Sequence, residues 1–229
     1  MSQWIKNVRN SGRFCLITIV IAGLAFSAHA SESVGKASSD RRGLLEITGT
    51  KSFYLTQFLV PGSDFLSIHG LTFDAQDNLY VGSVMGQAIY EIDTDRGEST
   101  MFVGPPKGMA DDLEFSPDGT VVWTSILTGT VHGRLPNGEV IVIAKDLPGV
   151  NAVAFHPDGR LFVTQVLWGD ALWELDITGE NPPRKVLSDL GHLNGFDFDS
   201  DGYLYGPLMF KGVVARIDVD SGEIKTLSS

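Results

Sequence analysis

The sequence predicts an all-β protein, a β-propeller of four-stranded antiparallel blades. Two observations support this. A phrase made of an apolar run, a Pro/Asp/Gly-type turn and a second apolar run occurs four times, and apolar and polar residues alternate within the runs. Successive phrases begin 42, 40 and 43 residues apart, at His69, Asp111, Asn151 and Asn194. A fixed period in this range is typical of repeat architectures, including propellers.

Each phrase extends into a unit of four short strands. A glycine follows each leading residue by about 18 positions, and it precedes another alternating run, a turn and a last apolar run. These glycines are Gly86, Gly129, Gly169 and Gly212. In the third unit Leu172, Glu174 and Asp176 fall on one face of an extended strand, which excludes a helix there. Strands of four to six residues joined by Gly, Asp, Asn and Pro turns fit every unit.

We expect blades at about residues 64–106, 107–148, 149–191 and 192–229, within a propeller domain spanning 43–229. The segment 44–60 has room for one or two further strands, one of which is expected to complete a blade from the other end of the chain. A β-sandwich or a solenoid with coincidental spacing is the alternative fold.

The N-terminus has the pattern of a secretory signal peptide over residues 1–30. Lys6, Arg9 and Arg13 precede an apolar stretch at 14–26, and Ala28-His29-Ala30 offers a cleavage site. The stretch is short for a membrane span, although an uncleaved anchor is the alternative. Residues 31–42 read as a flexible leader. The sequence therefore predicts an exported protein, periplasmic or extracellular.

The charge composition of the mature chain indicates which classes of binding partner are disfavoured. Without residues 1–30 the chain keeps 14 basic and 28 acidic residues, a net charge of −14. This balance disfavours nucleic acid and anionic membrane surfaces, and it suits a soluble protein that binds cations. The lone cysteine, Cys15, lies in the signal segment, so no disulfide is expected. We expect a small-molecule substrate and no membrane partner in the mature form.

Three segments carry a family resemblance: GFDFDSDGYLYG after Asn194, AVAFHPDGRLFVT after Asn151, and DDLEFSPDGT after Ala110. They resemble blade motifs of the senescence marker protein / gluconolactonase family, which is related to paraoxonases and strictosidine synthase-like propellers. The resemblance covers about residues 60–229. It implies a six-bladed ring, a divalent cation at the top of the channel, often calcium, and hydrolysis of lactones or related esters.

The family has six blades, whereas this sequence contains four repeat units. We therefore expect residues 43–229 to be an incomplete, C-terminally truncated part of a six-bladed ring and to be inactive alone, the alternative being a closed four-bladed ring. An open ring exposes a blade face and an unpaired edge, which favours self-association.

The same resemblance implies a metal site at Asp111, Asn151 and Asn194, with Asp112 as the alternative to Asp111. Carboxylate and amide oxygens are ligands that Ca²⁺ prefers. His69 departs from the family pattern, which has Glu there, and histidine is a better general base than calcium ligand. We therefore expect His69 and Asp111 to be catalytic. The competing interpretation is that these side chains only cap turns through hydrogen bonds to the backbone.

Apolar residues lie next to the glycine that follows each leading residue by about 18 positions. These loops are expected at the same end of the blades as the leading residues. They suggest a substrate with an apolar portion, since binding pockets are mostly apolar with a few polar groups. The substrate-binding candidates are Met85, Trp168, Met209 and Phe210, with Leu127 in the equivalent place. The alternative is that these side chains pack between blades.

The favoured function is a metal-dependent hydrolase of a lactone or related ester, with Ca²⁺ as its cofactor. The first alternative is a secreted, non-catalytic propeller that binds a ligand or a protein. The second is a lyase or synthase on the same scaffold, because a fold does not fix a function. The chain has no Gly-x-Ser-x-Gly, His-Glu-x-x-His or phosphate-loop motif to suggest other chemistry.

Overall fold

The computed structural model describes residues 43–47, 53–57 and 65–228. The chain divides into residues 1–55 and 56–229, and each part is described by itself. Strands β1 (Gly43–Ile47) and β2 (Phe53–Gln57) form a two-stranded sheet. The expected signal peptide, 1–30, and leader, 31–42, lie outside the described residues.

The other strands form four antiparallel sheets of four strands, each paired in chain order. The first sheet holds β3 (Ile68–Phe73), β4 (Leu79–Ser83), β5 (Ala88–Asp93) and β6 (Glu98–Val103). The second holds β7 (Asp112–Phe115), β8 (Val121–Ser125), β9 (Thr130–Arg134) and β10 (Val140–Ala144). The third holds β11 (Val150–Phe155), β12 (Leu161–Gln165), β13 (Ala171–Leu175) and β14 (Arg184–Ser188). The fourth holds β15 (Asp197–Phe198), β16 (Tyr203–Leu208), β17 (Val213–Asp218) and β18 (Ile224–Ser228), with a 3₁₀ turn η1 at Met209–Lys211.

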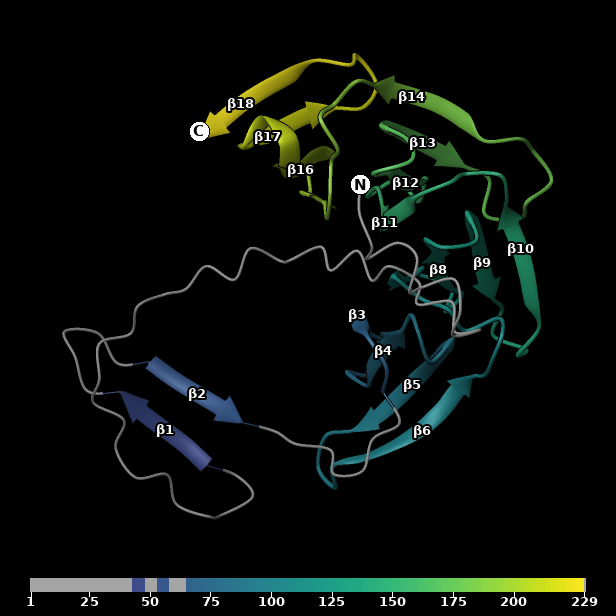
Figure 1. Ribbon diagram of the computed structural model, residues 1–229, viewed down its shortest axis with the longest axis vertical. Helices are drawn as coiled ribbons and strands as arrows, with labels where there is room; N and C mark the ends of the chain where they lie inside the picture. Colours follow the sequence, from purple (N-terminus) through teal and green to yellow (C-terminus); the bar gives the residue numbers. More distant parts are fainter. Residues whose placement is uncertain (1–42, 48–52, 58–64, 229) are drawn as a thin grey trace, which may run out of the picture. The chain divides into compact units, whose positions relative to one another are not determined.

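These four sheets lie side by side in an arc, as propeller blades do (Figure 1). The first strand of each sheet lies on the inner side of the arc, and β6, β10, β14 and β18 form its outer rim. The predicted all-β propeller class is confirmed. The described residues form no α-helix, and so none that is long and apolar enough to cross a membrane.

Asp and Gly residues shape the turns between the first and second strands of the sheets. Gly119 and Gly159 have φ values of 87° and 92°, which favour glycine. The Asp118 carboxylate accepts a hydrogen bond from the Thr120 N–H at 2.9 Å, and Asp158 accepts one from the Arg160 N–H at 3.1 Å. These acids therefore stabilise turns at the ends of the blades away from the leading residues, and they are not ligand candidates.

Apolar packing between neighbouring sheets forms the core. Ile89 and Trp123 are fully buried in the cluster joining the first two sheets, and Phe162 and Leu204 are fully buried in the one joining the last two. A third cluster, containing Val122, Val131, Val150 and Val163, joins the middle pair. Because side chains alternate along each strand, these residues point from the faces of the sheets, and they are buried where neighbouring blades pack together.

Candidate functional site

The leading residues of the four repeats lie at the starts of the inner strands. His69 lies on β3, Asp111 immediately precedes β7, Asn151 lies on β11, and Asn194 precedes β15. Antiparallel pairing returns the chain to this end between the second and third strands of each sheet, so those loops surround the same end of the inner strands. We call this end of the blades the top face.

Asp111 is the most buried charged side chain of the group, with 3% of its side chain exposed. Its N–H donates to the Thr124 carbonyl oxygen at 2.8 Å, which fixes the start of β7 against β8. Its Oδ2 accepts a hydrogen bond of 2.5 Å from Nδ2 of Asn151 on the next blade. Asp111 and Asn151, predicted from equivalent positions of two repeats, thus contact each other directly.

The second oxygen of this carboxylate faces His69. Oδ1 of Asp111 lies 2.9 Å from Nδ1 of His69, but the ring N–H is not directed at it. Among the described residues Oδ1 therefore has no hydrogen-bond donor, although it is buried. A buried carboxylate oxygen without a donor is costly. This oxygen is therefore available to a bound cation or to a hydrogen-bond donor of a ligand.

His69 differs from its neighbours in being accessible, with 47% of its side chain exposed. Close contact with the Asp111 carboxylate raises the pKa of His69 above its usual value, while partial burial acts in the opposite direction. Since Nδ1 faces Asp111, Nε2 is the ring nitrogen left to meet a ligand or water. The arrangement is that of a histidine beside a buried carboxylate, which suits proton transfer.

Asn151 is held from its backbone as well as its side chain. Its carbonyl oxygen accepts a hydrogen bond from the Thr124 hydroxyl, whose Oγ1 also accepts from the Asp112 N–H at 3.2 Å. Because the amide nitrogen of Asn151 donates to Asp111, its Oδ1 is the side-chain atom available to another partner. Thr124 therefore ties the second and third blades together at the site.

Asn194 is placed apart from this contact network. Its N–H donates to the Pro207 carbonyl oxygen at 3.2 Å, and its Nδ2 lies 3.9 Å from Sδ of Met209. No hydrogen bond between described residues joins Asn194 to Asp111 or Asn151. The structure thus brings His69, Asp111 and Asn151 into contact and leaves Asn194 as a separate polar group at the start of the fourth inner strand.

Asp112, the alternative to Asp111, already has donors for both carboxylate oxygens. Oδ1 accepts from the Leu113 N–H at 3.0 Å and Oδ2 from the Val153 N–H at 2.9 Å. Val153 is on β11, so Asp112 links the inner strands of the second and third blades. Burial raises the pKa of Asp112 to about 6, although both backbone hydrogen bonds act in the opposite direction.

Glu114 was not singled out from the sequence. It lies two residues beyond Asp112 and therefore on the same face of β7. Burial raises the pKa of Glu114 to about 8, and the negative charges of Asp197 and Asp112 add to the increase. The alternation of Asp112 and Glu114 in the run DLEF was the available signal, since it puts two acids on one face of an inner strand.

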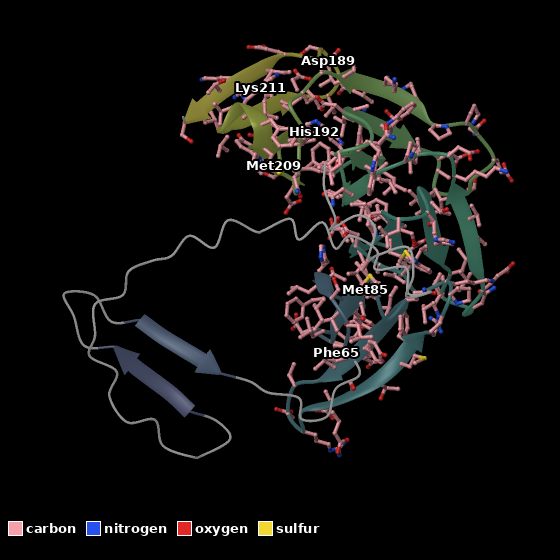
Figure 2. The ribbon with its side chains drawn as sticks, in the orientation of Figure 1. Phe65, Met85, Asp189, His192, Met209 and Lys211 are labelled. Atoms are coloured by element: carbon pink, nitrogen blue, oxygen red, sulfur yellow. The ribbon has the colours of Figure 1, made fainter. Side chains whose placement is uncertain are left out.

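The apolar candidates lie on loops of the top face and are mostly exposed. The exposed fraction is 51% for Met85, 53% for Trp168 and 66% for Phe210. Leu127, at 43%, is also exposed and not packed away between blades. Figure 2 shows Met85 in the first sheet and Met209, which contacts Asn194, in the fourth. Large exposed apolar side chains in every blade of this face suit contact with an apolar ligand.

Only part of the ligand set of a calcium ion is present among the described side chains. Two hard oxygens meet its needs: Oδ1 of Asp111, which is buried without a donor, and Oδ1 of Asn151. Within residues 65–228, however, no three His, Cys, Asp or Glu side chains are grouped so as to hold a metal. The residues therefore fit a cation whose other ligands are amide oxygens or water.

Comparison with known proteins supports the fold. No protein-family model matches the chain, and no curated protein sequence matches it. The chain is similar to virginiamycin B lyase from Staphylococcus aureus, with 16% identity and a TM-score of 0.62 over 79% of this chain and 61% of that chain. It is also similar to a gluconolactonase from Xanthomonas campestris, with 23% identity and a TM-score of 0.60 over 70% of this chain and 61% of that chain.

A third similar structure is the calcium-binding protein regucalcin from Agrobacterium tumefaciens, with 20% identity and a TM-score of 0.56 over 73% of this chain and 61% of that chain. At these identities the likeness shows the fold alone. The chain spans 61% of the length of each of the three proteins. The presence of a gluconolactonase and of regucalcin among them agrees with the resemblance noted in the sequence.

Proposed function

We propose that this propeller hydrolyses a lactone or a related ester at its top face. The observation that carries the proposal is the contact of His69 with Asp111: an accessible imidazole whose Nδ1 lies 2.9 Å from a carboxylate oxygen that is buried and lacks a directed donor. The likeness to the gluconolactonase supports the same reaction class.

In this reaction the chain's residues handle the proton of water. His69 accepts it at Nε2 as the water oxygen bonds to the carbonyl carbon of the substrate. Asp111, whose Oδ1 lies 2.9 Å from Nδ1, stabilises the positive charge that His69 then carries. When the bond between the carbonyl carbon and the ring oxygen of the lactone breaks, His69 returns the proton to the departing oxygen. The product is a hydroxycarboxylic acid.

A divalent cation, with Ca²⁺ as the first candidate, belongs to the proposal as well. Asp111, Asn151 and Asn194 are the residues proposed to hold it, through carboxylate and amide oxygens. When bound, such a cation polarises the carbonyl group and stabilises the developing negative charge. The likeness to calcium-binding regucalcin supports this choice. Oδ1 of Asp111 is required both by the cation and by His69, so the calcium dependence of the rate distinguishes metal-assisted hydrolysis from hydrolysis by the His69–Asp111 pair alone.

The exposed apolar side chains of the top face are proposed to contact an apolar part of the substrate. Trp168 and Phe210 offer the largest surfaces, and Met85 lies in the first blade. Met209 lies against Asn194, so it connects the apolar contacts with the polar group at the start of the fourth inner strand. A lactone with an alkyl chain is therefore the preferred class of substrate.

The experiment measures acid release from a short sugar lactone and an alkyl-substituted lactone, with calcium or with a chelator. It uses the chain and a version extended to a closed ring. We expect hydrolysis that falls at least about 100-fold in both variants, since His69→Gln removes the proton acceptor and Asp111→Asn removes the charge that stabilises protonated His69. Asp201→Asn, a surface turn variant, is the matched control. Absence of hydrolysis in both forms of the protein would overturn the proposal.

Two other functions can be distinguished from hydrolysis with the same proteins and substrates. A non-catalytic binding propeller would bind apolar lactones through Trp168 and Phe210 without turnover. A lyase, supported by the likeness to virginiamycin B lyase, would cleave an ester or ring without incorporating oxygen from water. Mass spectrometry of the product in ¹⁸O-labelled water separates hydrolysis from a lyase reaction.

Export is also part of the proposal. It is supported by the basic, apolar and small-residue segments of residues 1–30 and by the acidic balance of the remaining chain. Self-association is supported by exposed apolar residues of β3, where Leu71 and Phe73 are 58% and 53% exposed. Sedimentation of Phe73→Ser beside the unchanged chain tests that association.

A further inference from the structure

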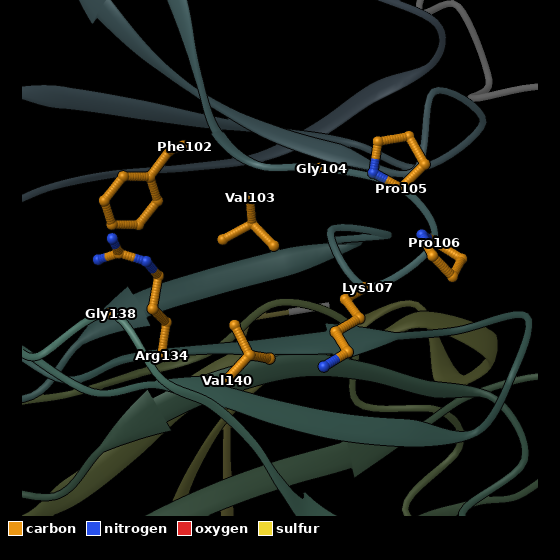
Figure 3. A pocket seen from close by; sticks show the side chains of 9 residues that line it. All are labelled: Phe102, Val103, Gly104, Pro105, Pro106, Lys107, Arg134, Gly138 and Val140. Atoms are coloured by element: carbon orange, nitrogen blue, oxygen red, sulfur yellow. The ribbon is translucent and has the colours of Figure 1, made fainter.

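A groove lies between the first and second sheets (Figure 3). Its volume is about 390 Å³, within the range of small-molecule sites. The end of β6, the loop that follows it and the hairpin from β9 to β10 form its walls. Phe102, Val103, Pro105 and Val140 make much of this lining apolar. None of the proposed catalytic or cation-binding residues lines it.

Two cations, Arg134 and Lys107, complete the lining. Within residues 65–228, neither lies within ion-pair distance of a carboxylate, whereas Arg160 contacts Asp158 at 2.8 Å and Asp220 at 2.7 Å. The whole chain carries a net charge of −11, so carboxylates outnumber cations on its surface. Two cations left without carboxylate partners in one groove form a local site for an anion.

Packing holds the Arg134 guanidinium and the backbone of Lys107 in place. The Arg134 guanidinium carbon lies 4.1 Å from the centre of the Phe102 ring, a cation–π contact that Figure 3 shows directly. The Phe102 ring packs edge-on against Tyr80 with 4.8 Å between ring centres. At the other end, Nε1–H of the fully buried Trp123 donates to the Lys107 carbonyl oxygen at 2.9 Å. The groove is therefore formed before any ligand enters it.

We propose that this groove binds a small organic carboxylate with a planar apolar body. The planar guanidinium of Arg134 matches a carboxylate through two parallel N–H bonds, and Lys107 adds a flexible positive charge. Val103, Val140 and Pro105 then cover the apolar body of the ligand. An inorganic anion such as phosphate would leave these walls in contact with water, so it fits the groove less well.

The test is a titration of the chain with benzoate, followed by NMR or calorimetry. We expect saturable binding, with the neutral isostere benzamide and inorganic phosphate each binding at least about tenfold more weakly. Arg134→Gln and Lys107→Gln each weaken benzoate binding at least about fivefold. Lys145→Gln changes an exposed cation that does not line the groove, and it leaves the affinity unchanged.

Three results overturn the proposal: no saturable binding of benzoate, equal binding of benzamide, or equal weakening by Lys145→Gln. Lys107 is exposed, so Lys107→Gln keeps the test valid if Arg134→Gln unfolds the protein. Arg134→Lys adds a further comparison, because it keeps the charge and removes the paired N–H geometry. Its affinity is expected between those of the unchanged chain and Arg134→Gln, and an affinity equal to that of the unchanged chain contradicts the proposed bidentate contact.

Discussion

Replacing Glu114 by Gln is predicted to change how the stability of the propeller depends on pH. Burial, with the charges of Asp197 and Asp112, raises the pKa of Glu114 from 4.5 to about 8 in the folded chain. In the unfolded chain the carboxyl group returns to its ordinary pKa. Between these two values the folded state keeps a proton that the unfolded state releases, so Glu114 makes unfolding easier as pH rises.

The magnitude follows from the linkage between proton binding and unfolding. Each pKa unit corresponds to about 1.4 kcal/mol, so the contribution of Glu114 that is fully present below pH 4.5 falls by roughly 3–5 kcal/mol by the time pH exceeds 8. Gln keeps the shape and cannot ionise. The free energy of unfolding of Glu114→Gln minus that of the unchanged chain is therefore expected to rise by this amount across the window.

Urea unfolding between pH 5 and pH 9 measures this difference directly. Taking the difference between the two proteins removes the effects of other groups that titrate, including Asp112, as long as their own pKa values stay similar. Glu98→Gln, which removes a carboxylate on the exposed start of β6, is the matched control. Parallel pH profiles for the unchanged chain and Glu114→Gln would refute the assignment of Glu114 as a buried acid that is protonated at neutral pH.

Two further predictions concern packing and substrate contact. A Cβ on Gly82 would lie 2.6 Å from the Ala110 carbonyl oxygen, so Gly82→Ala should lower the free energy of unfolding by about 1–3 kcal/mol in urea titrations. Gly104→Ala, whose nearest neighbour is a flexible methionine sulfur at 3.1 Å, should cost clearly less, and equal costs would contradict this reading. If the enzyme proposal holds, Trp168→Ala and Phe210→Ala should raise KM for an alkyl lactone by roughly tenfold with little change in kcat or in Tm, because both side chains are exposed. An unchanged KM would exclude them from the substrate site.

The fold could be predicted because the same pattern of strands and turns occurs four times in the sequence. Four copies of the same alternating run and turn define four sheets, and glycines such as Gly119 and Gly159 occupy the positive-φ positions that their turns require. Burial between blades then fixes which face of each strand is apolar. A pattern repeated four times leaves little choice of strand pairing.

The site was only partly predictable. Equivalent positions in successive repeats placed His69, Asp111 and Asn151 at one end of the inner strands, and the structure shows them in contact. Which of Asp111 and Asp112 faces His69 depends on how β7 meets β3, and that is a contact between blades, which alternation along one strand does not specify. The raised pKa of Glu114 also depends on tertiary structure, since burial is its main cause and the charge of Asp197 from another blade adds to it.

The central claim, that His69 and Asp111 act as one catalytic pair, is tested most directly by a double-mutant cycle on kcat/KM for lactone hydrolysis. The variants are His69→Gln, Asp111→Asn and the double variant, assayed at one calcium concentration. Groups that act as a unit give non-additive losses. We predict that the double variant is no more than about threefold slower than the slower single variant. Losses that multiply in the double variant, or single variants as fast as the unchanged protein, would contradict the account.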